Sequence, residues 1–173
     1  MKIHLVRHAE AIGRTGEIAD DHRYLTCRGR TRFRRVAATL EKQGIEPDYI
    51  LTSPLVRAVQ TADILAEKLH FSGDLLIEPL LAGGLTMPVL RDLLASHTLA
   101  GEIVLVGHEP DMGLLLGALL ATDSPCSIKK GGVVSLKLDL KHPSMPVEFI
   151  SLVTGGGKLV TNRTKALERL QSG

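Results

Sequence analysis

The sequence has few aromatic residues and few cysteines. Aromatic residues make up 3% of the 173 residues, and tryptophan is absent. We therefore expect an aliphatic core, and the shortage of base-stacking side chains argues against single-stranded nucleic acid as a partner. The two cysteines, Cys27 and Cys126, form no spaced metal motif and no disulfide framework, which is typical of a reduced cytoplasmic protein.

Long hydrophobic runs and a strong net charge are also lacking. The amino-terminal segment becomes charged at Arg7, too early for a signal peptide, and no stretch reaches the length of a membrane span. We therefore expect a cytoplasmic protein without a membrane partner. The net charge of +2 does not by itself predict a polyanionic partner. The arginines concentrated over 28–35 are interpreted as the solvated face of a helix.

Short apolar runs alternate with helical patterns along the chain. The apolar runs lie at 3–6, 49–52, 75–77, 102–107, 133–138 and 147–153. The first four are nearly continuous, as in strands covered on both faces, and the last two alternate, as in antiparallel strands near an edge. The helical patterns lie at 29–44, 54–70, 87–97 and 110–121. This alternation predicts an α/β three-layer sandwich, with a mostly parallel central sheet and helices on both of its faces.

The pattern predicts a single domain over 1–173, with a tail over 155–173 whose order the sequence does not determine. The segment "GGGK" at 155–158 lacks the spacing of a phosphate-binding P-loop and is interpreted as a linker. The segment "KALERL" at 165–170 is amphipathic. It leaves two alternatives open, because such a segment either packs on the body of the domain or frays.

Charged and titratable side chains follow three of the predicted strands. Arg7 and His8 follow the first, Ser53 and Arg57 follow the second, and His108 follows the fourth. Ligands of open α/β sheets collect outside the carboxyl ends of the strands, so we expect these side chains to meet there. Each has an ordinary structural explanation alone, but two arginines and two histidines at one sheet edge indicate a functional site.

The two arginines predict the charge of the ligand. A guanidinium group presents a planar fork of donors that suits phosphate oxygens, and two of them would repel each other without an anion between them. We therefore expect a phosphoryl group. A neutral imidazole can attack phosphorus, and a second histidine can stabilise the transition state. This chemistry needs no metal and no cofactor, and the sequence has no His-x-x-x-His, His-Glu-x-x-His or carboxylate cluster.

Four segments, in order along the chain, resemble the histidine phosphatase superfamily, which includes the phosphoglycerate mutases. They are "LVRHAEA" (5–11), with Ala9 in place of the signature glycine, "RYLTCRGRTRF" (23–33), "LTSPLVRAVQTA" (51–62) and "LVGHEP" (105–110). The residues of these segments are similar to those of the SixA-type phosphohistidine phosphatases within the superfamily. The resemblance implies a phosphoglycerate mutase-like fold.

The resemblance also implies a role for each site residue. By it, His8 is the nucleophile that becomes phosphorylated. Arg7 and Arg57 clamp the phosphate, and His108 stabilises the transferring group. Ser53 lies in the matching turn, where it either orients the pocket or caps the following helix.

The general acid is the least determined part of the predicted site. Larger members of the resembled family carry a glutamate after the third strand, where this chain has Glu78, facing either the pocket or solvent. Other candidate acids are Glu17, Asp20, Asp21 and Glu109. An alkoxide leaving group benefits from a positioned acid, whereas an imidazole, with an unperturbed pKa of about 6.5, needs little help. A compact site without an obvious acid therefore favours a phosphohistidine substrate.

The sequence thus predicts a metal-independent phosphatase that acts through a phosphohistidine on His8. We expect its substrate to be phosphohistidine in a protein, such as a histidine-containing phosphocarrier or a phosphotransfer domain. One alternative is a phosphatase of small phosphomonoesters or nucleotides with the same mechanism. Another is a non-catalytic phosphate-binding module, against which the presence of both His8 and His108 argues, because binding alone requires no nucleophile.

Overall fold

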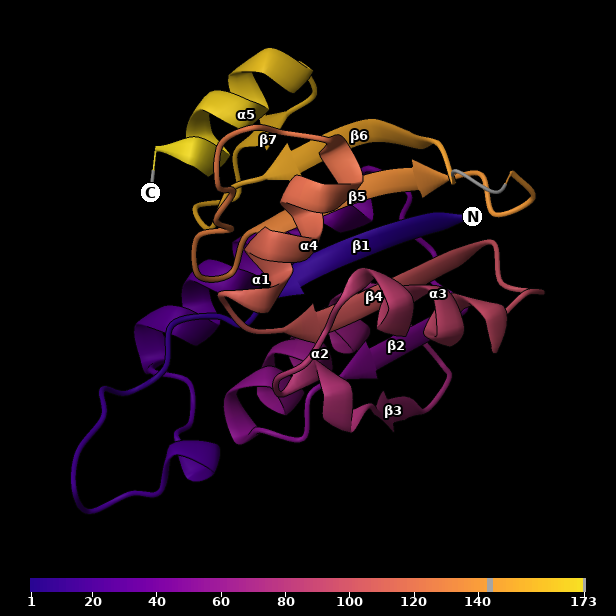
Figure 1. Ribbon diagram of the computed structural model, residues 1–173. Coiled ribbons are helices and arrows are strands. Elements are labelled where there is room, and N and C mark those ends of the chain that lie inside the picture. The colour runs from indigo at the N-terminus through magenta and orange to yellow at the C-terminus, as the bar shows by residue number, and fades with distance from the viewer. Residues whose placement is uncertain (143–144, 173) are drawn as a thin grey trace.

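The computed structural model describes residues 1–142 and 145–172. Its elements are β1 (Lys2–Arg7), η1 (Asp20–His22), α1 (Cys27–Lys42), β2 (Tyr49–Thr52), α2 (Val56–Lys68), β3 (Leu75–Ile77), η2 (Pro79–Leu81), α3 (Met87–Ala95), β4 (Glu102–Gly107), α4 (Asp111–Leu120), β5 (Val133–Leu138), β6 (Val147–Val153), β7 (Leu159–Val160) and α5 (Arg163–Gln171). Every strand and helix predicted from the sequence is present (Figure 1).

The strands of the described residues form one sheet in the order β3-β2-β4-β1-β5-β6-β7. The neighbours from β3 to β1 pair in parallel, whereas β5, β6 and β7 pair antiparallel, as predicted for β5 and β6. In this register Arg7 lies opposite Gly107, and Thr52 lies opposite Val106. The carboxyl ends of β1, β2 and β4 are therefore adjacent, so the segments that follow them begin side by side.

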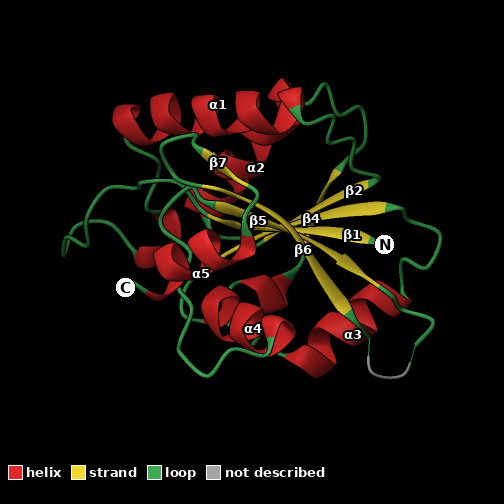
Figure 2. Ribbon diagram, turned by 90° about the horizontal axis from the view of Figure 1, so that it is seen from above, coloured by secondary structure: helices red, strands yellow, loops and turns green. Residues whose placement is uncertain are grey.

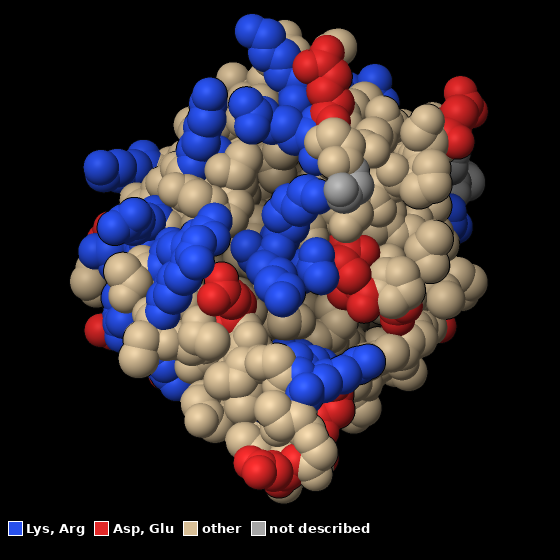
Figure 3. Space-filling view, turned by 90° about the vertical axis from the view of Figure 1, so that its left-hand side faces the viewer, with Lys and Arg blue, Asp and Glu red and all other residues tan. Residues whose placement is uncertain are grey.

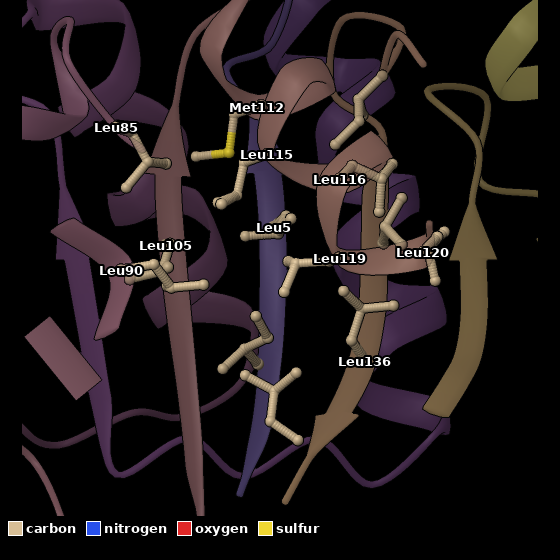
Figure 4. Packing of buried hydrophobic residues seen from close by; sticks show 14 of the residues in the cluster. Leu5, Leu85, Leu90, Leu105, Met112, Leu115, Leu116, Leu119, Leu120 and Leu136 are labelled. Atoms are coloured by element: carbon tan, nitrogen blue, oxygen red, sulfur yellow. The ribbon is translucent and has the colours of Figure 1, made fainter. Parts of the chain in front are cut away.

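Helices cover both faces of the sheet, which confirms the three-layer sandwich (Figure 2). One apolar cluster joins α1 and α2 to one face, and a second joins α3, α4 and α5 to the other. In the second cluster, Leu5 of β1 lies beside Met112 and Leu115 of α4, and Leu105 of β4 lies beside Leu90 of α3 (Figure 4). The core is aliphatic as predicted, since Phe33 is the one aromatic side chain among the buried apolar residues that the structure describes.

The third strand departs from its prediction. The apolar run at 75–77 predicts a strand covered on both faces, but 52% of Ile77 is exposed and Leu75 is only half-buried. The physical reason is position, because β3 is the edge strand of the sheet. Its continuous apolar run is a local property, whereas its place at the edge depends on the tertiary fold.

The segment 155–158 is not a linker. It turns the chain between β6 and β7, where Thr154 N donates to Lys158 O (2.9 Å) and Gly157 N donates to Thr154 O. Gly157 has a φ of +87°, which suits glycine. Of the two alternatives left open for "KALERL", the structure has the packed one, because Ala166 and Leu170 of α5 are buried in the core.

No helix in the described part of the chain combines the length and apolar character needed to cross a membrane.

Candidate active site

The histidine that follows β1 is held by both neighbouring elements. His8 is 8% exposed, and its backbone N donates to Gly107 O at the end of β4 (3.0 Å). The next peptide is fixed by α2, because Ala9 N donates to Thr61 Oγ1 (3.0 Å). The ring therefore projects from a backbone whose position both the sheet and a helix determine.

The hydrogen bond of His8 determines its tautomer. Its Nδ1 lies 2.7 Å from Ala9 O, and a carbonyl oxygen can only accept, so Nδ1 carries the proton. Nε2 makes no hydrogen bond within the described residues and keeps its lone pair. Burial, followed by the nearby charges of His108 and the arginines, lowers the pKa of His8 to about 3. The ring is therefore neutral near pH 7, which a nucleophile requires.

His108 follows β4 and lies beside His8, with ring centroids 5.0 Å apart and planes inclined by 51°. Its Nε2 lies 2.8 Å from Ser53 Oγ, which also accepts a hydrogen bond from Leu55 N (3.3 Å). The hydroxyl proton is therefore available to Nε2, an arrangement that favours a neutral His108 with its own proton on Nδ1. Burial is the main cause that lowers its pKa to about 4.

This contact decides between the two interpretations of Ser53. The N-cap of α2 is Leu55, and α2 has no side-chain cap bond. Ser53 therefore orients His108 and its own turn, and the interpretation of it as a helix cap is wrong.

Arg57 lies in the first turn of α2 and is 5% exposed. Its Nη1 donates to Asp20 O (2.6 Å) and its Nη2 donates to Asp20 Oδ2 (3.0 Å). Arg14 and Arg23 also pair with this carboxylate. These contacts, with the Arg14 hydrogen bond the largest, lower the pKa of Asp20 to about 2. Asp20 is therefore ionised and orients Arg57, so it is unsuited to donate a proton.

Arg7 is positioned through a loop on the other side of the pocket. Its Nη1 donates to Ile128 O (2.7 Å), while Ile128 N donates to Glu109 Oε1 (2.7 Å). The second oxygen of Glu109 accepts from Gly113 N (3.1 Å). Although burial raises the pKa of Glu109, both of its oxygens accept backbone hydrogen bonds. Glu109 thus acts as a brace for the Ile128 peptide, which in turn holds Arg7.

Three nitrogens of this pocket lack partners. Among the side chains that the structure describes, Arg7 Nε, Arg57 Nε and His108 Nδ1 are buried without a hydrogen-bond partner. Buried donors are costly unless a ligand satisfies them. Burial also lowers the pKa of both guanidinium groups, a cost that an anion would offset. Two cationic donors and one imidazole donor, next to a free His8 Nε2, suit a tetrahedral oxyanion.

The other predicted acids lie elsewhere. The Glu78 carboxylate accepts from Leu80 N (3.0 Å) and caps η2, and within the described residues it makes no bond to the arginines or histidines of the pocket. Glu17 and Asp21 are exposed. No group of three or more His, Cys, Asp and Glu side chains in the described chain is placed to hold a metal ion.

Some of the residues that position the site are absent from the predictions made from the sequence. Thr61, which accepts from Ala9 N, also donates to Arg57 O (2.6 Å). Thr61 lies four residues after Arg57 in the same predicted helix, and this spacing places both side chains on one face of the helix, so the sequence could have indicated Thr61. Gly131 N, with a φ of +71°, donates to both Arg7 O and His8 O (3.1 Å each). No local pattern marks Gly131 or Ile128, since both act through the backbone.

Comparisons with known proteins show what the chain resembles. Residues 3–82 match the model of the histidine phosphatase superfamily (branch 1). The chain is 34% identical to an uncharacterized protein of Picosynechococcus sp., over 79% of this chain and 85% of that one. It is 26% identical to the phosphohistidine phosphatase SixA of Escherichia coli, over 80% and 86%. The structure of the protein histidine phosphatase SixA complexed with tungstate superimposes with a TM-score of 0.79 at 23% identity, over 90% and 97%.

Proposed function

Because this chain belongs to the histidine phosphatase superfamily and is SixA-like within it, we propose that it hydrolyses phosphohistidine in a protein, with His8 as the nucleophile. The observation that carries this proposal is the set of three buried, unpartnered nitrogens beside the free Nε2 of His8. A phosphoryl group placed among them would accept from Arg7, Arg57 and His108 while its phosphorus faces the nucleophile.

In the first step, His8 Nε2 forms a bond to phosphorus and the bond from phosphorus to the substrate imidazole breaks. The leaving imidazole takes a proton from solvent on its distal nitrogen and departs neutral. The phosphorylated His8 ring keeps its Nδ1 proton and becomes cationic, and the Ala9 carbonyl stabilises that charge through the existing hydrogen bond. The two arginines and His108 stabilise the charge on the transferring oxygens.

In the second step, water attacks the phosphorus of phospho-His8. The bond from phosphorus to Nε2 breaks, inorganic phosphate forms, and the water proton passes to solvent or phosphate. His8 returns to its neutral form with the proton still on Nδ1. The rigid end of β1 keeps the nucleophile and Arg7 in the same relative position in both steps.

The bonding of the acidic residues supports a phosphohistidine substrate. Asp20 is ionised and bound to arginines, Glu109 accepts two backbone hydrogen bonds, and Glu78 caps its own turn. None of the three is arranged to protonate a leaving alkoxide. A substrate whose leaving group is an imidazole needs the least assistance from such an acid.

The proposal is tested by comparing turnover of a phosphorylated histidine-containing carrier with turnover of a panel of phosphomonoesters and nucleotides. Wild type is assayed beside His8→Gln, with His70→Gln, an exposed histidine, as the matched control. We expect the carrier to be the better substrate by kcat/KM and His8→Gln alone to be inactive. Faster turnover of phosphomonoesters would support the small-substrate alternative, and full activity of His8→Gln would refute the nucleophile.

A further inference from the structure

Arg7, His8, Arg57 and His108 together form what we call the phosphoryl pocket. A groove of about 730 Å³ opens beside this pocket and shares Arg7 with it. Its charged lining consists of Arg7, Glu10, Arg32, Lys129, Lys130 and Arg169. These residues come from β1 and the turn after it, α1, the loop before β5, and α5. Figure 3 shows the face to which the parallel strands point, where Lys and Arg side chains gather over the centre and the upper left.

The positive charge of this groove is not neutralised from within. Glu10, its one carboxylate, lies 3.9 Å from Arg28. Arg32, Lys129 and Lys130 form no ion pair with any carboxylate in the described residues, and neither does Arg169. From the sequence alone, the arginines of 28–35 are interpreted as a solvated helix face. For Arg32 that interpretation is incomplete, because it forms part of the groove wall.

The loop that carries two of these cations is tied to the catalytic strand. Gly131 N donates to Arg7 O and His8 O, and Arg7 N donates to Gly132 O (3.2 Å). On the other side the loop packs on the turn after β6, where a Cβ atom at Gly155 would collide with Lys130 O. Lys129 and Lys130 are therefore presented at a fixed place relative to His8, which is the geometry that recognition of a substrate requires.

From this juxtaposition we propose that the groove binds an acidic segment of the phosphorylated protein, next to its phosphohistidine. The inference rests on the proposed function and adds the chemistry of the partner. Four cations without carboxylate partners, on three separate elements, match carboxylates spread along a polypeptide. The groove extends well beyond a single phosphoryl group, and it has no aromatic side chain in its lining on which a nucleobase could stack.

The test uses two synthetic peptides that each carry one phosphohistidine. In one peptide a run of glutamates flanks the phosphohistidine, and in the other the same positions are glutamines. The readout is the ratio of kcat/KM for the acidic peptide to kcat/KM for the neutral peptide. It is measured for wild type, for the Lys129→Glu/Lys130→Glu variant, and for Lys42→Glu. Lys42 is an exposed lysine of the same helix as Arg32, about 15 Å further along it.

We expect wild type to prefer the acidic peptide by about tenfold or more at low salt, and the preference to fall as salt is raised. The double variant should lose or invert the preference, and Lys42→Glu should keep it. The inference is overturned by a wild-type ratio near one, by a double variant that keeps the preference, or by an equal loss in Lys42→Glu.

The neutral peptide separates this inference from the function on which it rests. If wild type hydrolyses the neutral peptide but shows no preference for glutamates, the groove is not a docking site and the proposed function stands. If wild type hydrolyses neither peptide, the proposed function fails and the groove inference falls with it.

Discussion

One buried histidine, His4, lies within β1 and another, His8, directly follows it, and the two have opposite environments. His4 is 2% exposed, and both of its ring nitrogens are bonded, Nδ1 to Ser135 Oγ (2.8 Å) and Nε2 to Glu102 Oε1 (2.7 Å). His8 uses only Nδ1, and its neighbour His108 has a buried Nδ1 without a partner. The two histidines are alike in residue type and burial, so these properties do not separate a structural histidine from a functional one.

His4 and His8 differ in how many of their ring nitrogens are hydrogen-bonded. At the amino end of the sheet a histidine, a serine and a glutamate satisfy one another, and a fully satisfied buried network stabilises a fold. At the carboxyl end the arginines and histidines leave donors and a lone pair unused, at a cost in stability that a ligand would recover. We therefore assign His4 to stability and His8 to chemistry, and the predictions below test that division.

The largest expected effect is on turnover when the nucleophile is removed. His8→Gln should reduce kcat by at least about 10³-fold, because no other group occupies its place. Rapid-mixing assays with a phosphohistidine peptide measure this loss, and circular dichroism checks that the variant is folded. A variant that kept a tenth of wild-type activity would contradict the assignment.

His108→Ala should reduce kcat by about 10²–10³-fold, since it removes one donor that we expect to stabilise the transferring oxygens. Ser53→Ala should act in the same direction but more weakly, because it loosens His108 without removing it. Steady-state kinetics on both variants provide the measurement. An effect of Ser53→Ala as large as that of His108→Ala would show that Ser53 does more than orient the ring.

His4→Leu should lower the stability of the fold while leaving turnover nearly unchanged. It removes the hydrogen bond from His4 to the buried Glu102 carboxylate, which keeps Lys2 as a partner, and losing one hydrogen-bond partner of a buried polar group costs about 1–3 kcal/mol of unfolding free energy. Urea denaturation measures the loss, and kcat of the folded variant should stay within about threefold of wild type. A large loss of activity in a stably folded His4→Leu would contradict the division of roles between His4 and His8.

The lowered pKa values of the pocket histidines predict an acid-sensitive fold. In the native state these pKa values are about 3 for His8 and about 4 for His108, whereas both would be about 6.5 in the unfolded chain. Below about pH 6.5 the unfolded chain therefore binds protons that the folded state cannot, so stability falls as the pH decreases. Each histidine contributes at most about 1.4 kcal/mol per pH unit.

Urea denaturation across the range from about pH 7 to about pH 5 measures this slope. The His8→Gln/His108→Gln variant should lose less stability on acidification than wild type, while His70→Gln should behave as wild type. Equal slopes for all three proteins would mean that the pocket histidines titrate normally.

The smallest effect is expected at Glu78. Because its carboxylate caps η2, Glu78→Gln should change kcat on phosphohistidine by less than about threefold. The same assay with a phosphomonoester shows whether the carboxylate serves another substrate. A loss of about 10²-fold on either substrate would identify Glu78 as the general acid.

Periodicity and strand-end position account for the parts of this molecule that the sequence predicts. The strands, the helices and the convergence of Arg7, His8, Arg57 and His108 follow from local patterns and one topological rule. The exposure of β3 does not, because it depends on which strand lies at the edge. The pairing of Arg57 with Asp20 and the bracing of Arg7 through Ile128 are equally inaccessible, since they depend on how loops distant in sequence fold back.

The most direct test of the account is to trap the phosphorylated enzyme. Wild type is mixed with a radiolabelled phosphohistidine substrate, quenched within the first turnover, digested and mapped. We predict an acid-labile, base-stable label on the peptide that contains His8, and no label in His8→Gln. A label on Ser53, or an acid-stable label that persists in His8→Gln, would contradict the central claim that the free Nε2 at the end of β1 is the nucleophile.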